Sequence, residues 1–499
     1  AFKDEDMPLA TVYSRAKLGV QAPLVTVEVH LSGGLPAFNI VGLPEASVRE
    51  SRDRVRSALV NSRFEFPVSR ITVNLAPADL PKEGGRFDLP IPIGILVASG
   101  QLPTAPLANC ELIGELGLSG ELRAVDAALP AAVQAGEAGH SLILPAANAG
   151  LASILDASDI REAHSLLAVV AHLHGQQALP YASADNAAEI TENYPDLCEV
   201  RGQASAKRAL EIAAAGGHSL LLSGPPGTGK TLLANRLPGI LPPLNESERL
   251  EIATVQSVAG QPLRLNRPFR APHHTASGVA LVGGGSYPRP GEISLAHNGV
   301  LFLDELPEYP RKVLEVLREP IESGEVTISR ATQQLTFPAR FQLISAMNPC
   351  PCGFDGDSSK DCRCTPDQIQ RYRGKLSGPL LDRIDLRITV PRLPPGVLQE
   401  DGLAESSATV RARVCAARER QLQRSGTINA QLSAAQVREF CTLDTPSKQF
   451  MLKAEQKLGL SARAHHRLQK IARSIADLEG EHAITLAHLQ EALHYRGDF

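Results

Sequence analysis

The chain has 499 residues, of which 43% are hydrophobic and 21% are charged, and its formal net charge at pH 7 is −4. A chain of this length can bury a large core and is expected to form about two to four domains. The slightly acidic charge balance excludes a uniformly basic nucleic-acid-binding protein, so any contact with DNA must come from local basic patches.

The sequence contains neither a membrane span nor a secretory signal. No run of uncharged apolar residues comes near the roughly 18 that a membrane helix needs. Residues 1–7 are too charged to begin a signal peptide. We therefore expect a cytoplasmic protein without membrane contact. Because Met7 is a more natural start than Ala1, we expect residues 1–6 to be an extension without a functional role.

Residues 7–180 are predicted to form an N-terminal α+β or α/β domain. Strand-like stretches at 25–31, 71–75 and 141–144 alternate with helical ones such as 47–60. The polar segment 181–196 has no strong periodicity and is predicted to be a linker.

A complete phosphate-loop pattern, G-x-x-x-x-G-K-[ST], follows the linker between the apolar run 218–223 and the helix-like stretch 232–237. Glycines let the backbone curl so that its N–H groups point at phosphate oxygens, while Lys230 supplies a positive charge and Thr231 a hydroxyl for Mg²⁺. The pattern therefore predicts an ATP site. Its residues are Gly224, Pro225, Pro226, Gly227, Thr228, Gly229, Lys230 and Thr231.

Two adjacent carboxylates supply the second half of the predicted ATP site. Residues 299–305 read Gly-Val-Leu-Phe-Leu-Asp-Glu, which predicts a buried parallel strand ending in an acidic pair. At the carboxyl end of such a strand, Asp304 would hold Mg²⁺ and Glu305 would polarise the attacking water. The alternative is an ordinary solvated turn.

The next apolar strand, 341–347, ends at Asn348. Its amide is predicted to hydrogen-bond the attacking water or the γ-phosphate. Further along, Arg383 is predicted to act as an arginine finger on a neighbouring subunit's nucleotide. The alternative for Arg383 is a salt bridge to Asp382 or Asp385.

Four of the eight cysteines follow Asn348 with the spacing C-x-C-x₉-C-x-C. Four thiolates in a short loop predict a tetrahedral structural Zn²⁺ site, although C-x-C is tighter than the commoner C-x₂-C. Reduced free thiols or a redox pair remain the alternatives. The four residues are Cys350, Cys352, Cys362 and Cys364.

Residues 197–395 are predicted to form an αβα ATPase core, which the Pro-rich stretch 391–396 closes. Residues 396–499 are predicted to form a helical lid, with Ser433 and Thr485 as helix N-caps. Its predicted helices span 407–424, 433–441, 446–457, 461–479 and 485–496.

These motifs resemble the AAA+ ATPases of the magnesium-chelatase and MCM-related clade. Residues 266–274, 303–308 and 348–353 narrow the resemblance to the bacterial ComM/YifB family of magnesium-chelatase-like proteins, over nearly the whole chain. The resemblance implies a homohexameric, ATP-driven helicase that promotes branch migration when incoming single-stranded DNA recombines during natural transformation. It also implies that Arg463 senses nucleotide phosphates and that Arg383 acts across the subunit boundary.

Two stretches resemble the hairpins that point into the central channel of related helicases. Residues 283–291 resemble an insert within the second core helix, and residues 325–337 resemble a hairpin before the sensor strand. Arg289 and Arg330 are therefore candidates to grip the backbone of single-stranded and branched DNA. The alternative is that both are ordinary surface charges.

The N-terminal domain also resembles the Lon-protease fold, through residues 81–88 and 113–120. In that register the catalytic serine falls on Arg86 and the catalytic lysine near Leu129. Without a nucleophile or a base, acyl transfer cannot proceed, so we predict a non-proteolytic domain. Arg86 and Lys82 could instead contact DNA or form structural ion pairs with Glu83 or Asp88.

Two other functions use the same core. One is the ATPase subunit of a metal-chelatase machine, which would need separate partner subunits. The other is an ATP-dependent peptidase, which the residues at positions 86 and 129 disfavour. The fused N-terminal domain and the basic hairpins favour DNA as the substrate.

Overall fold

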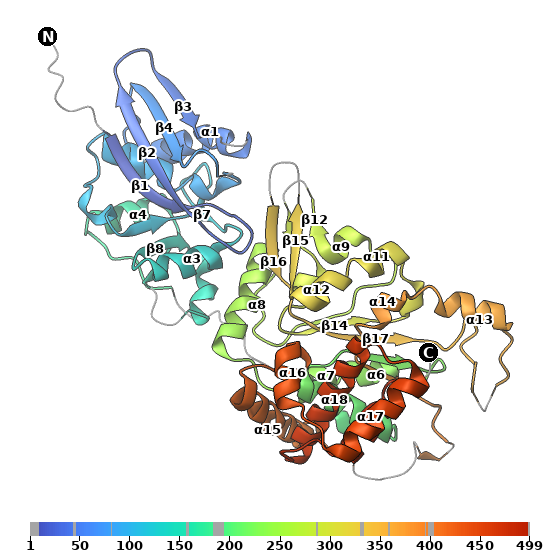
Figure 1. The fold of residues 1–499 in the computed structure, drawn as a ribbon. Coiled ribbons are helices and arrows are strands. Elements are labelled where there is room, and N and C mark those ends of the chain that lie inside the picture. Colours follow the sequence, from blue (N-terminus) through green and yellow to red (C-terminus); the bar gives the residue numbers. More distant parts are fainter. Residues whose placement is uncertain are drawn as a thin grey trace. The chain divides into compact units, whose positions relative to one another are not determined.

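The computed structural model describes residues 9–42, 46–80, 82–155, 159–182, 194–285, 288–329, 334–357, 360–394, 396–397 and 404–497. The chain divides into two compact units (Figure 1). The first comprises residues 1–190 and 246–265, and the second comprises residues 191–245 and 266–499. None of the helices in the described ranges is both long and apolar enough to cross a membrane.

The first unit is built on a seven-stranded mixed sheet in the order β3-β4-β2-β1-β5-β8-β9. β2 pairs antiparallel with β1 and β4, and the remaining neighbours are parallel. The strands are β1 (Leu9–Arg15), β2 (Leu24–Ser32), β3 (Ala37–Val41), β4 (Arg70–Ala76), β5 (Cys110–Leu112), β8 (Ser141–Pro145) and β9 (Ile160–Ala163), and a separate hairpin pairs β6 (Glu115–Leu116) with β7 (Leu122–Arg123).

Helices cover the sheet of the first unit because its strands alternate apolar residues between the two faces. Residues such as Val27 of β2 and Ile143 of β8 pack with α1, α2 and α4. Leu142 and Leu144 point to the opposite face, where they pack with α3 and α8. The helices are α1 (Ala46–Asn61), α2 (Pro90–Ala98), α3 (Ala128–Glu137), α4 (Leu166–Leu173) and α8 (Glu246–Val258).

The position of α8 differs from the sequence-based division of the chain. Residues 246–265 lie within the predicted ATPase core, yet they pack in the first unit. Ala253 and Leu265 are buried in one cluster with Leu129 of α3. Ser257 strengthens this contact, since its carbonyl accepts a hydrogen bond of 3.2 Å from the backbone N–H of Ala127.

The second unit contains a five-stranded, fully parallel sheet in the order β11-β14-β17-β10-β18. The central strands β10, β14 and β17 are buried along their whole length, as near-continuous apolar runs predict. Loops that follow these strands therefore meet at one edge of the sheet, where α/β proteins bind ligands. The strands are β10 (Leu220–Ser223), β11 (Phe269–Arg270), β14 (Val300–Leu303), β17 (Gln342–Met347) and β18 (Leu386–Thr389).

Short helices and two antiparallel hairpins complete the core of the second unit. The hairpins are β12 (Gly283–Gly284) with β13 (Arg289–Pro290), and β15 (Glu325–Ser329) with β16 (Gln334–Pro338). They lie side by side, since a Cβ at Gly283 would come within 2.9 Å of the Ile328 side chain. The helices are α5 (Ala204–Gly216), α6 (Lys230–Ala234), α7 (Leu237–Ile240), α9 (Gly278–Val282), α10 (Glu292–Leu295), α11 (Arg311–Glu315), α12 (Arg318–Ser323), α13 (Pro366–Arg373) and α14 (Gly378–Leu381).

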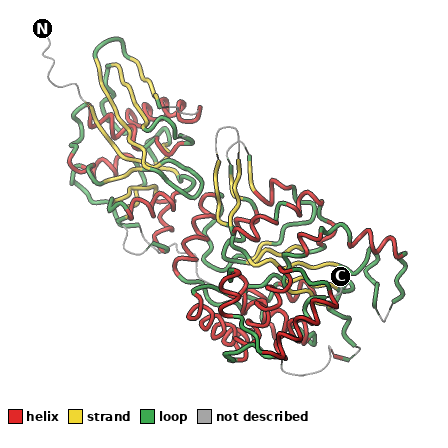
Figure 2. The backbone as a smooth tube through the Cα atoms, in the orientation of Figure 1, coloured by secondary structure: helices red, strands yellow, loops and turns green. Residues whose placement is uncertain are grey.

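The C-terminal part of the second unit is helical, as predicted (Figure 2). Ser433 caps α16 in a capping box with Gln436, and Thr485 caps α19. α15 and α18 pack on α5, so the lid and the sheet share one hydrophobic core. The helices are α15 (Ser407–Ser425), α16 (Ala434–Phe440), α17 (Thr445–Leu458), α18 (Ala462–Glu479) and α19 (Leu486–His494).

Candidate active site and cysteine cluster

The phosphate loop connects the end of β10 to α6, as the sequence predicts. Gly227 and Gly229 have φ angles of 79° and 89°, in the left-handed region that favours glycine. A Cβ at Gly224 would lie 2.2 Å from the carbonyl oxygen of Val390, so this position also excludes a side chain. The shape of the loop therefore depends on all three glycines of the pattern.

Lys230 places its ammonium group inside the phosphate loop. The side chain is largely buried, and Nζ donates hydrogen bonds to the carbonyls of Gly224 at 2.7 Å and Pro225 at 2.9 Å. Nζ also lies 3.3 Å from Oδ1 of Asn348, so the predicted sensor residue reaches the predicted phosphate-binding lysine. Burial lowers the pKa of Lys230, while the nearby Asp304 carboxylate raises it. The Lys230 ammonium group therefore donates to three protein oxygens. Phosphate oxygens of a bound nucleotide could accept these hydrogen bonds instead.

Thr231 and Asp304 form the predicted Mg²⁺ pair. The Thr231 hydroxyl donates to Oδ2 of Asp304 at 2.8 Å, which joins the start of α6 to the end of β14. A hydroxyl and a carboxylate at the edge of the site supply the oxygen ligands that Mg²⁺ prefers beside substrate phosphates. The donor set therefore fits this ion.

Glu305 follows Asp304 in the left-handed conformation, with φ of 51°, and its side chain is half exposed. Its backbone N–H donates to Oδ1 of Asp304 at 2.9 Å. Its carboxylate pairs with His274, whose Nδ1 lies 3.0 Å from Oε2 of Glu305. Sequence reasoning used the His273-His274 pair only as a family motif and missed this contact, because the two partners come from different loops.

Arg383 and Arg463 lie together at a second location, beside the end of α12. Both guanidinium groups pair with the carboxylate of Glu322 at the end of α12, and the Arg383 contact measures 3.0 Å. Arg383 therefore pairs with neither Asp382 nor Asp385, the partners weighed from sequence. A cavity of about 490 Å³ adjoins both arginines, and among the described residues that line it none belongs to the phosphate loop.

The structure places one of the two candidate DNA-binding arginines. Arg289 is exposed on β13. Arg330 lies outside the described residues, between β15 and β16.

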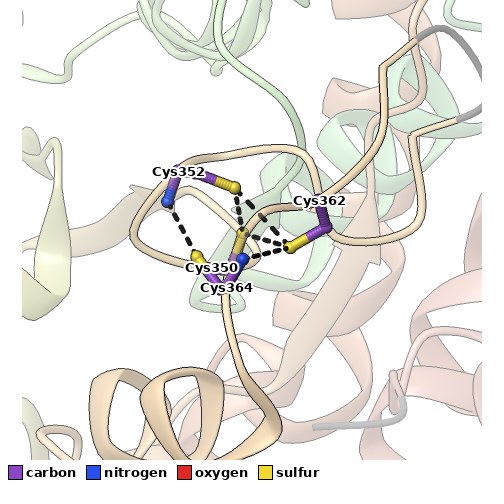
Figure 3. A group of neighbouring side chains, drawn as sticks. All are labelled: Cys350, Cys352, Cys362 and Cys364. Carbon is purple, nitrogen blue, oxygen red and sulfur yellow. Dashed lines mark hydrogen bonds between the residues drawn. The ribbon is translucent and has the colours of Figure 1, made fainter.

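The four cysteines of the predicted metal site converge (Figure 3). All four sulfur atoms lie within 4.8 Å of one another, and three measured separations are 3.4, 3.6 and 3.7 Å. Tetrahedral zinc with Zn–S bonds of about 2.3 Å would require separations of about 3.8 Å. Backbone N–H groups of Arg363 and Phe354 lower the pKa of the Cys352 thiol to about 6, whereas the pKa values of Cys362 and Cys364 are raised, because burial and hydrogen bonds with neighbouring thiols outweigh the backbone N–H groups that lower them. The cluster therefore fits a metal ion.

The cysteine loop packs directly on the phosphate loop. A Cβ at Gly353 would come within 2.8 Å of the Pro226 ring. Arg373 of α13 anchors the same loop, since it pairs with Asp355 at 2.8 Å and donates to the carbonyl of Pro349 at 3.1 Å. The cysteine loop thus lies against the nucleotide site.

Burial contradicts the DNA contact that the sequence left open for Arg86 and Lys82 in the first unit. Arg86 is buried, and its guanidinium donates to the carbonyls of Arg15, Asp126 and Ala127. Burial lowers its pKa to about 10. Lys82 is also buried and donates to the carbonyl of Pro77. The predicted ion-pair partner Asp88 pairs with Arg54 at 2.7 Å instead.

A phosphate loop and an acidic strand end on this parallel sheet, together with a helical lid, define an ATPase of the AAA+ class. Three family profiles together match most of the chain: "Subunit ChlI of Mg-chelatase" over residues 27–148, "Magnesium chelatase, subunit ChlI" over 196–398, and the ChlI C-terminal region over 404–496. The chain therefore belongs to the magnesium-chelatase ChlI family.

Full-length relatives place the chain within this family more narrowly. It is 55% identical to "Competence protein ComM" of Haemophilus influenzae, over 98% of both chains. It is 52% identical to "Uncharacterized protein YifB" of Salmonella typhimurium, over 98% of this chain and 97% of the relative. The "Magnesium-chelatase 38 kDa subunit" of Cereibacter sphaeroides matches only 30% of this chain, at 26% identity. The predicted ComM/YifB relationship is confirmed.

Proposed function

We propose that this chain is a homohexameric, ATP-driven DNA helicase or translocase that promotes branch migration of single-stranded and branched DNA during natural transformation. The observation that carries the proposal is the match over 98% of both chains to a relative named "Competence protein ComM". Competence is the capacity to take up DNA, and incoming single strands must be paired with chromosomal DNA. We accordingly propose that the protein works in the cytoplasm.

The residues around the phosphate loop have the roles that phosphoryl transfer requires. Lys230 and the loop N–H groups would bind the β- and γ-phosphates of ATP. Thr231 and Asp304 would hold Mg²⁺, which neutralises phosphate charge when it is bound. Glu305 would polarise the attacking water, and Asn348 would report on the γ-phosphate through its contact with Lys230.

The position of Arg383 and Arg463 supports a ring. Both pair with Glu322, beside a cavity whose described lining includes no phosphate-loop residue. Within one subunit, neither arginine contacts the residues that would bind the phosphates. We therefore propose that both act on the nucleotide of a neighbouring subunit, where they would stabilise the charge that develops during hydrolysis.

The two adjacent hairpins are the proposed DNA-binding elements. Arg289 is exposed on one of them, and Arg330 is the corresponding candidate of the other. Contacts from arginine to the phosphodiester backbone carry no base information, which suits a motor that must act on any sequence.

We also propose that the four-cysteine cluster holds a structural Zn²⁺. The sulfur separations fit tetrahedral thiolate coordination, and the loop packs on the phosphate loop at Pro226. Metal analysis of natively purified protein should give about one zinc per chain, because such sites bind zinc tightly. Less than about half an equivalent would contradict the proposal.

A metal-chelatase subunit is the second candidate, because the core profile is that of ChlI. The partial match to the chelatase subunit, compared with full-length matches to ComM and YifB, favours the DNA motor.

Steady-state ATP hydrolysis with and without single-stranded DNA tests the proposal. Strong stimulation by DNA that disappears in Glu305→Gln is expected for a DNA-coupled motor. Hydrolysis that is indifferent to DNA would favour the chelatase-type function. Branch migration of a synthetic three-strand junction would then test the remodelling step itself.

A further inference from the structure

A small cavity lies between α18, α19 and β18, and its volume is about 230 Å³. It is lined by three arginines, Arg387 of β18, Arg467 of α18 and Arg496 after α19, and by apolar side chains that include Leu468 and Ala492. A cavity that combines apolar side chains with several arginines concentrates positive charge where water is partly excluded. Its attraction for an anion is therefore stronger than that of an open surface.

This cavity is distinct from the larger one of about 490 Å³ beside the arginine pair. Arg383 and Arg463 adjoin the larger cavity, and neither is among the described residues that line the smaller one. Different faces of α18 explain this, since Ala464 lines the smaller cavity and Arg463 the larger. Arg467 lies between these faces and lines both cavities.

The positive charge in the smaller cavity is incompletely paired. In the described parts of the chain, the three arginines form one ion pair, from Arg467 to the half-exposed Asp382 at 3.8 Å. Asp385 is the second carboxylate of the lining, but it has other partners. It accepts a hydrogen bond of 3.2 Å from the backbone N–H of Ser219, and Nδ1 of His218 lies 3.3 Å away. Three guanidinium groups thus face two carboxylates, one of which is already engaged.

The arginines of this cavity repel one another. The pKa of Arg387 is lowered to about 10. Burial is the main cause, and the positive charges of Arg467 and Arg496 add to it, against the attraction of Asp382. An anion bound among these groups would offset the repulsion and stabilise the charged form of each guanidinium group.

The three guanidinium groups have donors to spare for such an anion. Each donates to one or more backbone carbonyls, namely Arg387 to Leu381, Arg467 to Ile384 at 2.6 Å and to Leu381 at 3.5 Å, and Arg496 to Leu458 at 3.3 Å. A guanidinium group carries five N–H donors in a planar fork, and this fork matches the oxygens of a phosphate group. Several donors of each group therefore stay available beside the carbonyl bonds.

The size of the cavity favours a small anion. Pockets that bury a drug-sized ligand have volumes of about 300–1,000 Å³, so a volume of about 230 Å³ suits inorganic phosphate better than a complete nucleotide. Hydrolysis of ATP releases inorganic phosphate, so the reaction of an ATPase supplies this ligand.

Two of the three arginines also hold the segment that carries Arg383. Arg387 donates to the carbonyl of Leu381, and Arg467 donates to that of Ile384, so their acceptors lie on both sides of Arg383. A phosphate that draws these guanidinium groups into the cavity competes with the two carbonyls. Binding in the cavity therefore loosens the segment that positions Arg383.

We propose that the cavity between α18 and α19 binds inorganic phosphate through Arg387, Arg467 and Arg496, and that phosphate bound there lowers the rate of ATP hydrolysis through the segment that carries Arg383. The effect on hydrolysis rests on the proposed role of Arg383 at a neighbouring nucleotide. Binding of phosphate requires only the cavity.

Calorimetric titration with inorganic phosphate at constant ionic strength tests the binding site. The titrations use Lys230→Ala protein, because an intact phosphate loop would also bind phosphate. In this background, Arg387→Ala and Arg496→Ala are each expected to weaken phosphate binding by about tenfold or more, since each removes charge-assisted hydrogen bonds. Arg438→Ala is the matched control. It removes an exposed arginine of α16 and should leave the affinity unchanged.

Three results would overturn the binding site. The first is no detectable phosphate binding, or affinities of Arg387→Ala and Arg496→Ala within about twofold of their parent. The second is binding that is lost in Arg383→Ala but kept in Arg496→Ala, which would assign the phosphate to the arginine pair at Glu322. The third is ADP that binds more tightly than phosphate and is weakened by Arg496→Ala, which would identify a nucleotide as the ligand. If Arg387→Ala does not fold, Arg496→Ala still decides.

Steady-state hydrolysis by protein with an intact phosphate loop tests the second part of the proposal. With ADP release as the readout, added phosphate should lower kcat without changing KM for ATP, and Arg496→Ala should lose this inhibition. Inhibition that is purely competitive with ATP in both proteins would contradict the effect on Arg383. If the protein hydrolyses no ATP, the proposed function is contradicted, whereas the calorimetric result still supports or overturns the phosphate site.

Discussion

The second unit holds two groups of basic side chains in different ways. Lys230 is buried among oxygens of its own loop and of Asn348, within the site that would bind nucleotide. Arg383 and Arg463 converge instead on the single carboxylate of Glu322. Lys230 has its partners within the phosphate-loop site, whereas Arg383 and Arg463 share one carboxylate partner away from that site. This difference supports the proposal that Arg383 and Arg463 act on the nucleotide of a neighbouring subunit.

A large loss of activity is expected at the phosphate-loop site. Glu305→Gln removes the proposed general base and should lower kcat by about 10²- to 10⁴-fold. Lys230 keeps its partners in this variant, so ATP should still bind. Equilibrium binding of a fluorescent ATP analogue alongside steady-state hydrolysis checks both points. Hydrolysis within about twofold of wild type would remove Glu305 from the mechanism.

At the arginine cluster, Arg383→Ala should lower kcat by about 10³-fold or more while each subunit keeps its affinity for ATP. Arg392→Ala is a matched control, since this arginine pairs with Asp357 on the cysteine loop and not with Glu322. A variant of Arg383 that loses ATP binding and hydrolysis together would instead place this arginine in the phosphate-binding site of its own subunit.

Loss of the cysteine cluster should destabilise the loop that supports the phosphate loop. Cys362→Ser is expected to abolish zinc binding and to lower Tm by about 5 °C. This shift corresponds to a loss of roughly 2 kcal/mol in the free energy of unfolding, since about 1 kcal/mol changes Tm by about 2–4 °C in a protein of this size. Cys415→Ser changes a cysteine of α15 outside the cluster and should alter neither quantity. Metal analysis and differential scanning calorimetry measure both. An unchanged Tm after loss of zinc would separate the cluster from the stability of the core.

The smallest effect is expected at the hairpin formed by β12 and β13. Arg289→Ala should weaken DNA binding equally for all sequences and reduce the slope of log affinity against log salt concentration by about one. Protein stability should stay the same because the side chain is exposed. Anisotropy titrations at several salt concentrations test this. An unchanged slope would show that Arg289 contacts no phosphate.

The features that sequence predicted correctly are local ones. The lid helices follow from apolar periodicity and N-cap residues such as Ser433, which the structure confirms. The sequence also predicted where the buried strand before Asp304 begins and ends. Four apolar residues stand between a glycine and an acidic pair, and these four residues form the strand.

Sequence reasoning failed where residues far apart in the chain meet. The partners of His274 and Arg383 are Glu305 and Glu322, and no local pattern announces either contact. For Arg86 the sequence left open a DNA contact or an ion pair with Glu83 or Asp88, and charged residues are almost never fully buried without partners. Its partners are three backbone carbonyls, which leave no trace in the sequence.

Mixing two inactive variants tests most directly whether the active site is shared between subunits. Lys230→Ala subunits cannot bind phosphate but carry an intact Arg383, and Arg383→Ala subunits carry an intact phosphate loop. Some interfaces of a mixed ring would combine both intact halves. We predict that mixing restores part of the ATPase activity, in proportion to such interfaces. Mixtures that stay as inactive as their components, in rings shown to contain both variants, would contradict a site built from two subunits.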